Sequence, residues 1–198
     1  MQLELKDIGK KFQQQWLFRH IDFSMSSGES LSVTGRNGAG KSTLIQIVYG
    51  LVQQSEGQVL IDGNSDFKAS KIFSYTSPSM ALPSEFTLLE IFDLYVKMGK
   101  ITIDLESFLA FSEFNSIQAR KMVKLFSSGM MQRLKTALCL STSASIVLLD
   151  EPLTNMDIQG EKWYKNCVQN RSSSLLIIAG NNPTEYEFTK FNINLSPQ

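Results

Sequence analysis

The stretch GRNGAGKST at residues 35–43 constrains the fold of this chain more than any other. It contains Gly-x-x-x-x-Gly-Lys-Ser between an expected strand at residues 31–34 and an expected helix at residues 42–49. Glycines let the backbone curl so that its N–H groups face an anion, and the positive end of the helix dipole adds to the attraction. The alternative is a glycine-rich turn with a chance lysine. The strand–loop–helix context favours a phosphate-binding loop.

We therefore predict that the whole loop binds ATP. The Lys41 ammonium can reach the β- and γ-phosphates, which gives it a catalytic role, and the Ser42 hydroxyl can ligate Mg²⁺. The predicted ATP-binding residues of the loop are Gly35, Arg36, Asn37, Gly38, Ala39, Gly40, Lys41, Ser42 and Thr43.

Two carboxylates follow an apolar run in SIVLLDEP, which begins at Ser145. A nucleotide site needs a carboxylate for Mg²⁺ at the end of a buried strand, and Asp150 stands there. Glu151, one residue later, can polarise a water for attack on the γ-phosphate. Carboxylates at a strand end can also be turn residues. Beside a phosphate loop, the metal and catalytic roles are favoured.

The pattern of apolar residues predicts an α/β core with two small lobes. Residues 12–20 suit a loop or hairpin between the first two strands, and residues 83–140 are mostly helical with a break near 99–102. One apolar helical face runs from Leu88 to Val96. A further helix is expected at 161–169. Strands are expected at residues 1–8, 21–25, 31–34, 58–62, 72–76, 145–149 and 175–179.

Composition excludes several classes of protein. Nineteen basic residues balance nineteen acidic ones, so no global positive field favours nucleic acid. Cys139 and Cys167 are too few for a disulfide framework and lack a spacing that suggests zinc. The start lacks the apolar stretch of a signal peptide, and no run approaches the roughly 18 apolar residues of a membrane span. We expect a reduced, cytosolic protein that reaches a membrane only through a partner.

A third stretch, LFSSGMMQRL at residues 125–134, resembles the signature motif of ABC ATPases, whose usual form is Leu-Ser-Gly-Gly-Gln. Phe126 takes the leucine's place, and Ser127 suits an N-cap on the helix that follows. Gln132 and Arg133 then stand where the family expects them. The resemblance implies a site for the γ-phosphate of ATP held by the opposite subunit. It is formed by Ser127, Ser128, Gly129 and Met130.

The resemblance extends over nearly the whole chain. EPLTNMD looks like the family's D-loop and ends at Asp157. The aromatic residue that stacks on adenine in the family matches Phe12, with Trp16 and Phe18 as rivals. The resemblance implies a P-loop NTPase fold in a single domain over residues 1–198, with a RecA-like core and an N-terminal antiparallel β lobe. A helical lobe at about residues 79–140 is inserted in the core.

Two positions depart from the family pattern. Pro78 stands where the family has a glutamine that contacts Mg²⁺ and the attacking water, and proline offers no side-chain donor or acceptor. Asn181 stands where the family has a switch histidine, since the one histidine, His20, lies far upstream. An asparagine amide can still donate to a phosphate oxygen, but it carries no charge. The alternative is that Asn181, in GNNP, only turns the chain.

The resemblance implies an ATP-hydrolysing subunit of an ABC transporter, with ATP and Mg²⁺ as cofactors. It would form a head-to-tail homodimer or heterodimer with another ABC ATPase subunit and power a separate integral membrane permease from the cytoplasmic face. No nucleic acid partner is expected. One alternative is a nucleotide-gated binding module with little turnover. The other is a soluble ABC ATPase acting on ribosomes or DNA, but such members usually carry paired domains or long insertions, and this chain has neither.

Overall fold

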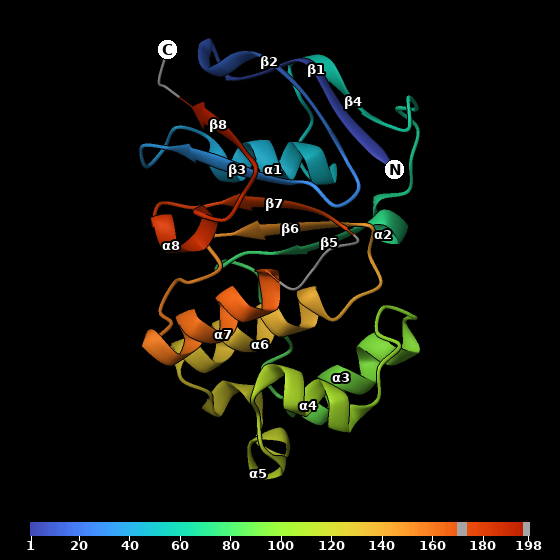
Figure 1. The fold of residues 1–198 in the computed structure, drawn as a ribbon, viewed down its shortest axis with the longest axis vertical. Helices are drawn as coiled ribbons and strands as arrows, with labels where there is room; N and C mark the ends of the chain where they lie inside the picture. Colours follow the sequence, from blue (N-terminus) through green and yellow to red (C-terminus); the bar gives the residue numbers. More distant parts are fainter. Residues whose placement is uncertain (170–173, 196–198) are drawn as a thin grey trace.

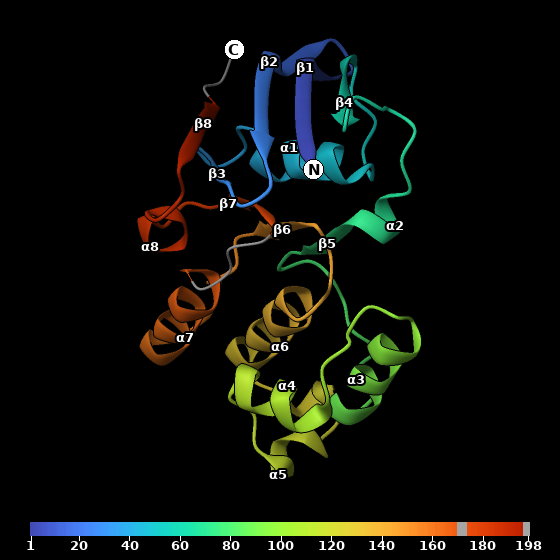
Figure 2. The same ribbon diagram turned by 45° about the vertical axis from the view of Figure 1, so that its right-hand side comes forward.

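The computed structural model describes residues 1–169 and 174–195, which form two sheets and the helices around them (Figure 1). The strands of the smaller sheet lie in the order β2-β1-β4, and those of the larger sheet in the order β5-β6-β7-β3-β8. The small sheet and α1 lie on one side of the large sheet, and α6 and α7 lie on the other (Figures 1 and 2).

The small sheet is antiparallel and consists of β1 (Gln2–Phe12), β2 (Gln15–Ser26) and β4 (Glu56–Ile61). A hairpin was expected across residues 12–20, but β2 already begins at Gln15, so the expected loop was too long. The polar run of glutamines concealed a strand whose inward-facing Phe18 is buried in the core. This sheet forms the N-terminal antiparallel lobe.

The large sheet is parallel, with β3 (Ser30–Gly35), β5 (Phe73–Thr76), β6 (Ile146–Asp150), β7 (Leu175–Ala179) and β8 (Phe191–Leu195). Every residue of β6 and β7 is buried, because helices cover both faces. The predicted strands at 145–149 and 175–179 are thus present. The sequence did not predict β8, whose asparagines alternate with apolar residues on an edge strand.

Three helices pack directly on this sheet. They are α1 (Lys41–Tyr49), α6 (Ser128–Leu140) and α7 (Ile158–Gln169). Apolar residues of α1 join the small sheet in one core, and those of α6 and α7 belong to a second core on the opposite face. Two single-turn helices, α2 (Ala69–Ile72) and α8 (Pro183–Tyr186), precede β5 and follow β7; neither was predicted.

The segment between β5 and β6 is helical, with α3 (Leu88–Lys97), α4 (Leu105–Ser112), α5 (Ser116–Ala119), a 3₁₀ turn at Val123–Leu125, and α6. A capping box between Thr87 and Glu90 starts α3. Figure 2 shows these helices beyond α6, away from the small sheet. Within the described ranges, no helix combines the length and apolar character that crossing a bilayer requires. Cys139 and Cys167 are free thiols.

Candidate functional site

The glycine-rich loop connects β3 to α1, as the sequence predicts. Gly38 and Gly40 have φ values of +81° and +99°, in the left-handed region that favours glycine. A side chain at Gly40 is also excluded by packing, because a Cβ there would lie 2.6 Å from Cδ2 of Leu17. The small sheet thus packs against the glycine-rich loop through Leu17 of β2. Helix α1 begins immediately after the loop, at Lys41.

The Lys41 ammonium curls back over this loop. Its Nζ donates to the main-chain oxygens of Gly35 at 3.1 Å and Arg36 at 3.3 Å. The side chain is only 6% exposed. A positive charge is therefore held beside the loop backbone, where it can meet an incoming phosphate.

Ser42 connects the start of α1 to the end of β6. Its hydroxyl donates to Oδ1 of Asp150 at 2.9 Å. Burial raises the pKa of Asp150 to about 6; the Ser42 hydrogen bond opposes this shift, the Glu151 charge adds to it, and Lys41 opposes it. A hydroxyl and a carboxylate are hard oxygen donors of the kind that Mg²⁺ binds, so the residues present fit that ion.

Glu151 and Asn181 meet at the same edge of the large sheet. The parallel register pairs Asp150 with Ala179, so the residues that follow these two lie side by side. The Asn181 amide Nδ2 donates to Oε1 of Glu151 at 3.1 Å. Glu151 itself has a φ of +44°, which turns the chain away from the strand. The loop after β7 therefore delivers a polar side chain to the predicted catalytic carboxylate.

Pro78 follows β5 and is held through its main chain. Its carbonyl oxygen accepts a hydrogen bond of 2.7 Å from Nζ of Lys135, on α6. Burial lowers the pKa of this lysine, which is 7% exposed. Sequence reasoning missed Lys135, because its partner lies 57 residues away along the chain.

A second pocket, of about 290 Å³, lies between the start of α6 and the start of α7. Ser127 caps α6, since its Oγ accepts from the Met130 N–H at 3.2 Å. A Cβ on Gly129 would lie 2.7 Å from the Asn155 main-chain oxygen, so glycine is needed there. The lining includes the four predicted signature residues and three residues of the loop before α7: Ser127, Ser128, Gly129, Met130, Asn155, Met156 and Asp157.

The three aromatic candidates for base stacking differ in their surroundings. Phe12 is 54% exposed and lines a pocket of about 390 Å³ together with Lys41, Ser42 and Glu151. Trp16 lies under the Arg19 guanidinium, 4.1 Å from its ring centroid, and Phe18 is 2% exposed. Phe18 lies against the glycine-rich loop, since a Cβ at Gly40 would be 2.9 Å from its Cδ1, but its ring is buried. Of the three rings, Phe12 is the one that lines the pocket beside this loop.

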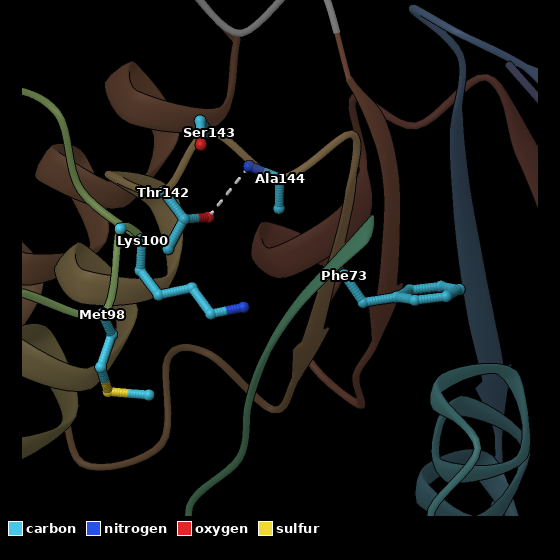
Figure 3. A pocket seen from close by; sticks show the side chains of 7 residues that line it. Phe73, Met98, Lys100, Thr142, Ser143 and Ala144 are labelled. Carbon is cyan, nitrogen blue, oxygen red and sulfur yellow. Dashed lines mark hydrogen bonds between the residues drawn. The ribbon is translucent and has the colours of Figure 1, made fainter. Parts of the chain in front are cut away.

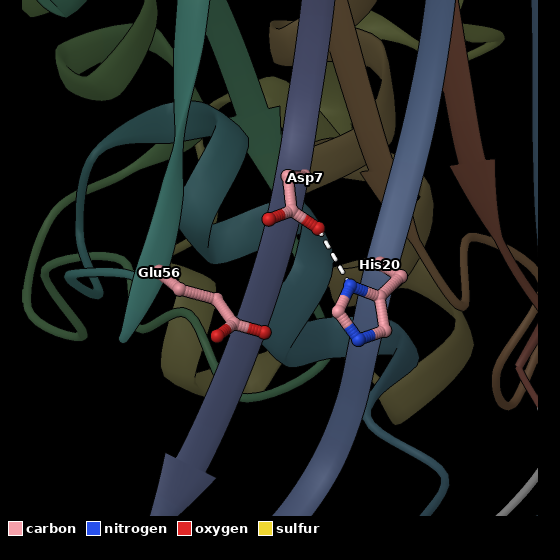
Figure 4. Close-up of side chains that lie close together, drawn as sticks. All are labelled: Asp7, His20 and Glu56. Carbon is pink, nitrogen blue, oxygen red and sulfur yellow. Dashed lines mark hydrogen bonds and ion pairs between the residues drawn. The ribbon is translucent and has the colours of Figure 1, made fainter.

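His20 lies in the small sheet and not with Glu151 and Asn181. Its Nδ1 lies 2.7 Å from Oδ1 of Asp7, and Glu56 lies nearby (Figure 4). Both Glu56 oxygens accept from Arg19, at 2.7 and 2.9 Å. The hydrogen bond between His20 and Asp7 and the ion pair between Arg19 and Glu56 therefore account for this group of side chains.

A groove separates the core from the helical segment. One pocket here has a volume of about 450 Å³. Figure 3 shows the side chains that line it, among them that of Lys100. It shares Phe73, Met98, Lys100 and Thr142 with a more apolar pocket of about 600 Å³. The larger pocket is lined by residues that include Tyr49, Leu51, Met80, Leu82, Leu94, Tyr95 and Met98.

Comparison with known proteins agrees with this geometry. The family model described as "ABC transporter" matches residues 18–154. The cytochrome c biogenesis ATP-binding export protein CcmA of Agrobacterium fabrum is 28% identical over 85% of this chain and 83% of its own length. The CcmA protein of Idiomarina loihiensis is 30% identical over 73% of this chain and 68% of its own. The mouse ABC-type organic anion transporter ABCA8A is 35% identical over 76% of this chain, which spans only 10% of that protein.

Solved structures show the same fold. A putative ABC transporter ATP-binding protein from Pyrococcus furiosus superposes with a TM-score of 0.84 over 98% of both chains, at 19% identity. A dimeric ATP-binding cassette in a post-hydrolysis state, bound to ADP and phosphate, superposes with a TM-score of 0.85 over 98% of this chain and 94% of the other, at 21% identity. The predicted P-loop NTPase fold is confirmed. This chain belongs to the ABC transporter family, as an ATP-binding (ATPase) subunit.

Proposed function

We propose that this chain hydrolyses ATP to power a separate membrane permease. The observation that carries the proposal is the contact between Glu151 and Asn181 beside the phosphate loop. A degenerate nucleotide site has no need of a carboxylate placed to activate water. Relatives with transport names, such as a ribose import ATP-binding protein of Bacillus subtilis and a Nod factor export ATP-binding protein of Bradyrhizobium diazoefficiens, support the link to transport.

Each group at the site has a part in this reaction. The loop N–H groups and Lys41 bind the phosphates, and Phe12 stacks on the base. Ser42 and Asp150 would hold Mg²⁺, which when bound neutralises phosphate charge. Glu151 accepts a proton from the attacking water, and Asn181 orients that carboxylate through the bond at 3.1 Å.

Asn181 also sets a limit on the rate. A neutral amide makes a hydrogen bond roughly half as strong as a charged imidazolium does, so less charge is stabilised on the transferring phosphoryl group. Pro78 offers no side-chain contact to metal or water. We therefore expect turnover to be slower than that of a subunit with histidine and glutamine at these positions.

Two copies of the chain, or this chain and a related one, would enclose ATP head to tail. The pocket at Ser127 and Asp157 then faces the partner's γ-phosphate, with the positive end of the α6 dipole directed at it. Glu151→Gln cannot accept the proton from water, so this variant should bind ATP without hydrolysing it and accumulate as the ATP-bound dimer. Size-exclusion chromatography of the variant with ATP and with ADP tests this. A variant that stays monomeric in the presence of ATP would contradict the prediction.

The groove beside α3 suits the permease. Its mainly apolar lining fits the apolar face of an amphipathic segment. This docking would hold the chain at the cytoplasmic face of the membrane.

The decisive experiment is steady-state ATP hydrolysis by the chain with its membrane partner, with Lys41→Ala as the inactive control. Activity that is abolished by Lys41→Ala supports the proposal. Unchanged ATP affinity in Lys41→Ala would refute the role given to the phosphate loop. Identifying what co-purifies with the chain from native membranes tests the permease.

Pro78 and Asn181 keep one other function in view, a nucleotide-gated binding module. Such a module would close on ATP and release it without turnover. The same assay distinguishes the two, since ATP binding without hydrolysis in the presence of the partner favours the module.

A further inference from the structure

We infer that Glu185 is a positioning residue for ATP hydrolysis, which holds Glu151 and Asn181 in their working arrangement. The inference rests on the proposed function. Glu185 lies in α8, after the loop that carries Asn181, and no part of the reaction described above uses it.

The Glu185 carboxylate joins two separate segments of the chain. Its Oε1 accepts from the Leu153 N–H at 3.2 Å, and its Oε2 accepts from the N–H groups of Asn181 at 3.1 Å and Asn182 at 3.2 Å. The side chain is 3% exposed. A buried carboxylate with three backbone donors therefore bridges the turn after β6 and the loop after β7.

This arrangement is more than a local helix cap. The capping box with Asn182 accounts for one of the three bonds, but the bond to Leu153 spans 32 residues of sequence. Gly180 is fitted to the same carboxylate, since a Cβ there would lie 2.2 Å from Oε2 of Glu185. The loop after β7 thus wraps closely around this one side chain.

Both segments that Glu185 holds lead to the reacting groups. Leu153 follows Glu151 by two residues, in a turn closed by the Thr154 N–H on the Glu151 carbonyl oxygen. Asn181 donates its main-chain N–H to Glu185 and its side-chain amide to Glu151. Main chain and side chain of Asn181 are therefore fixed between two carboxylates. A displacement of about 1 Å in such a group can cost about 100-fold in rate.

The hydrogen bonds to Glu185 support this role. Burial raises the pKa of the carboxyl, the backbone N–H groups of Leu153, Asn182 and Asn181 oppose the shift, and the Glu151 charge adds to it. The three N–H groups are all paired only if both side-chain oxygens of Glu185 accept hydrogen bonds.

Glu185→Gln tests the inference with almost no change of shape. Glutamine keeps one acceptor oxygen, but its NH₂ group cannot accept, so one of the two segments is released. We expect kcat to fall at least tenfold while the KM for ATP changes less than threefold, because Glu185 does not contact the phosphate loop or Phe12. Hydrogen exchange of the Leu153, Asn181 or Asn182 amides should become faster in the purified chain.

Tyr164→Phe is the matched control. The Tyr164 hydroxyl donates to the main-chain oxygen of Glu185 at 2.9 Å in the same buried region, and this bond leaves the Glu185 carboxylate and its three backbone donors untouched. This variant should unfold a few degrees lower and keep the wild-type kcat. A parallel loss of kcat in Tyr164→Phe would show that general destabilisation causes the effect, and would overturn the inference.

Two further results separate the inference from the proposed function. If the wild-type chain hydrolyses ATP and Glu185→Gln does so equally fast, the inference fails and the proposed function stands. If the wild-type chain with its partner hydrolyses no ATP, the proposed function itself fails. In the Glu151→Gln background, Glu185→Gln should lower the residual rate by much less than tenfold, since one of the two groups that it positions is already lost.

Discussion

The side-chain amide of Asn181 lies 3.1 Å from Oε1 of Glu151 and donates a hydrogen bond to it. The contact joins the ends of β6 and β7, so the carboxylate that would activate water is oriented by a neutral group. Asn181 also lies in a tight loop after Gly180. Its side chain donates to the Glu151 carboxylate, and its main-chain N–H donates to the Glu185 carboxylate. The loop therefore does more than turn the chain.

Replacing Asn181 tests whether this contact serves turnover. Asn181→Ala removes the donor and should lower kcat about tenfold, equivalent to ~1.4 kcal/mol, the scale of one hydrogen bond. Asn181→His restores a donor that can carry charge and should be at least as fast as wild type. Steady-state ATPase assays of the two variants give the result. If both match wild type, Asn181 only shapes the loop.

The raised pKa of Asp150 should make the stability of the chain depend on pH in buffer without metal or nucleotide. Its pKa is about 6 in the folded chain and near 3.8 when unfolded, so between these values the folded state holds a proton that the unfolded state has lost. Stability should therefore fall by about 2–3 kcal/mol as pH rises from 4 to 7. Urea unfolding across this range measures it.

Asp150→Asn is the control for this pH dependence. The amide oxygen can still accept from Ser42, but no charge is buried, so the variant should lose this fall and be more stable than wild type at pH 7. The burial-raised pKa of Glu185 contributes with the same sign in both chains, so the difference between them isolates Asp150. Parallel curves would show that Asp150 titrates normally.

The sequence predicted the parts of the site that have a local pattern. The phosphate loop, Asp150 and Glu151 follow from strand–loop–helix order and from carboxylates at a strand end, which are read within a few residues. Glu185 and Lys135 could not be found this way, because their partners lie 32 and 57 residues away. Strand β8 was missed because its alternating asparagines resemble a loop. Only the folded chain brings these groups together.

The hydrogen bond from Lys135 to the Pro78 carbonyl oxygen should stabilise the folded chain. Lys135→Met keeps an unbranched side chain that is one atom shorter and removes the donor to the Pro78 carbonyl oxygen, and should destabilise the chain by about 1–2 kcal/mol. Lys165→Met, which breaks the exposed ion pair with Glu187, is the control and should change stability by less than about 0.5 kcal/mol. Chemical unfolding compares them, and equal effects would mean that the Pro78 contact contributes nothing.

Phe12 should determine nucleotide affinity through its exposed ring. Stacking of a base on an aromatic side chain contributes about 1–3 kcal/mol, so Phe12→Ala should raise the KM for ATP by about 5- to 150-fold with little change in kcat. Because any base can stack, the KM for GTP should rise in parallel. Trp16→Ala is the matched control, since Trp16 does not line the pocket that holds Phe12 and Lys41, and its KM should stay near wild type. If Trp16→Ala raises KM and Phe12→Ala leaves it unchanged, the base stacks on Trp16 and not on Phe12.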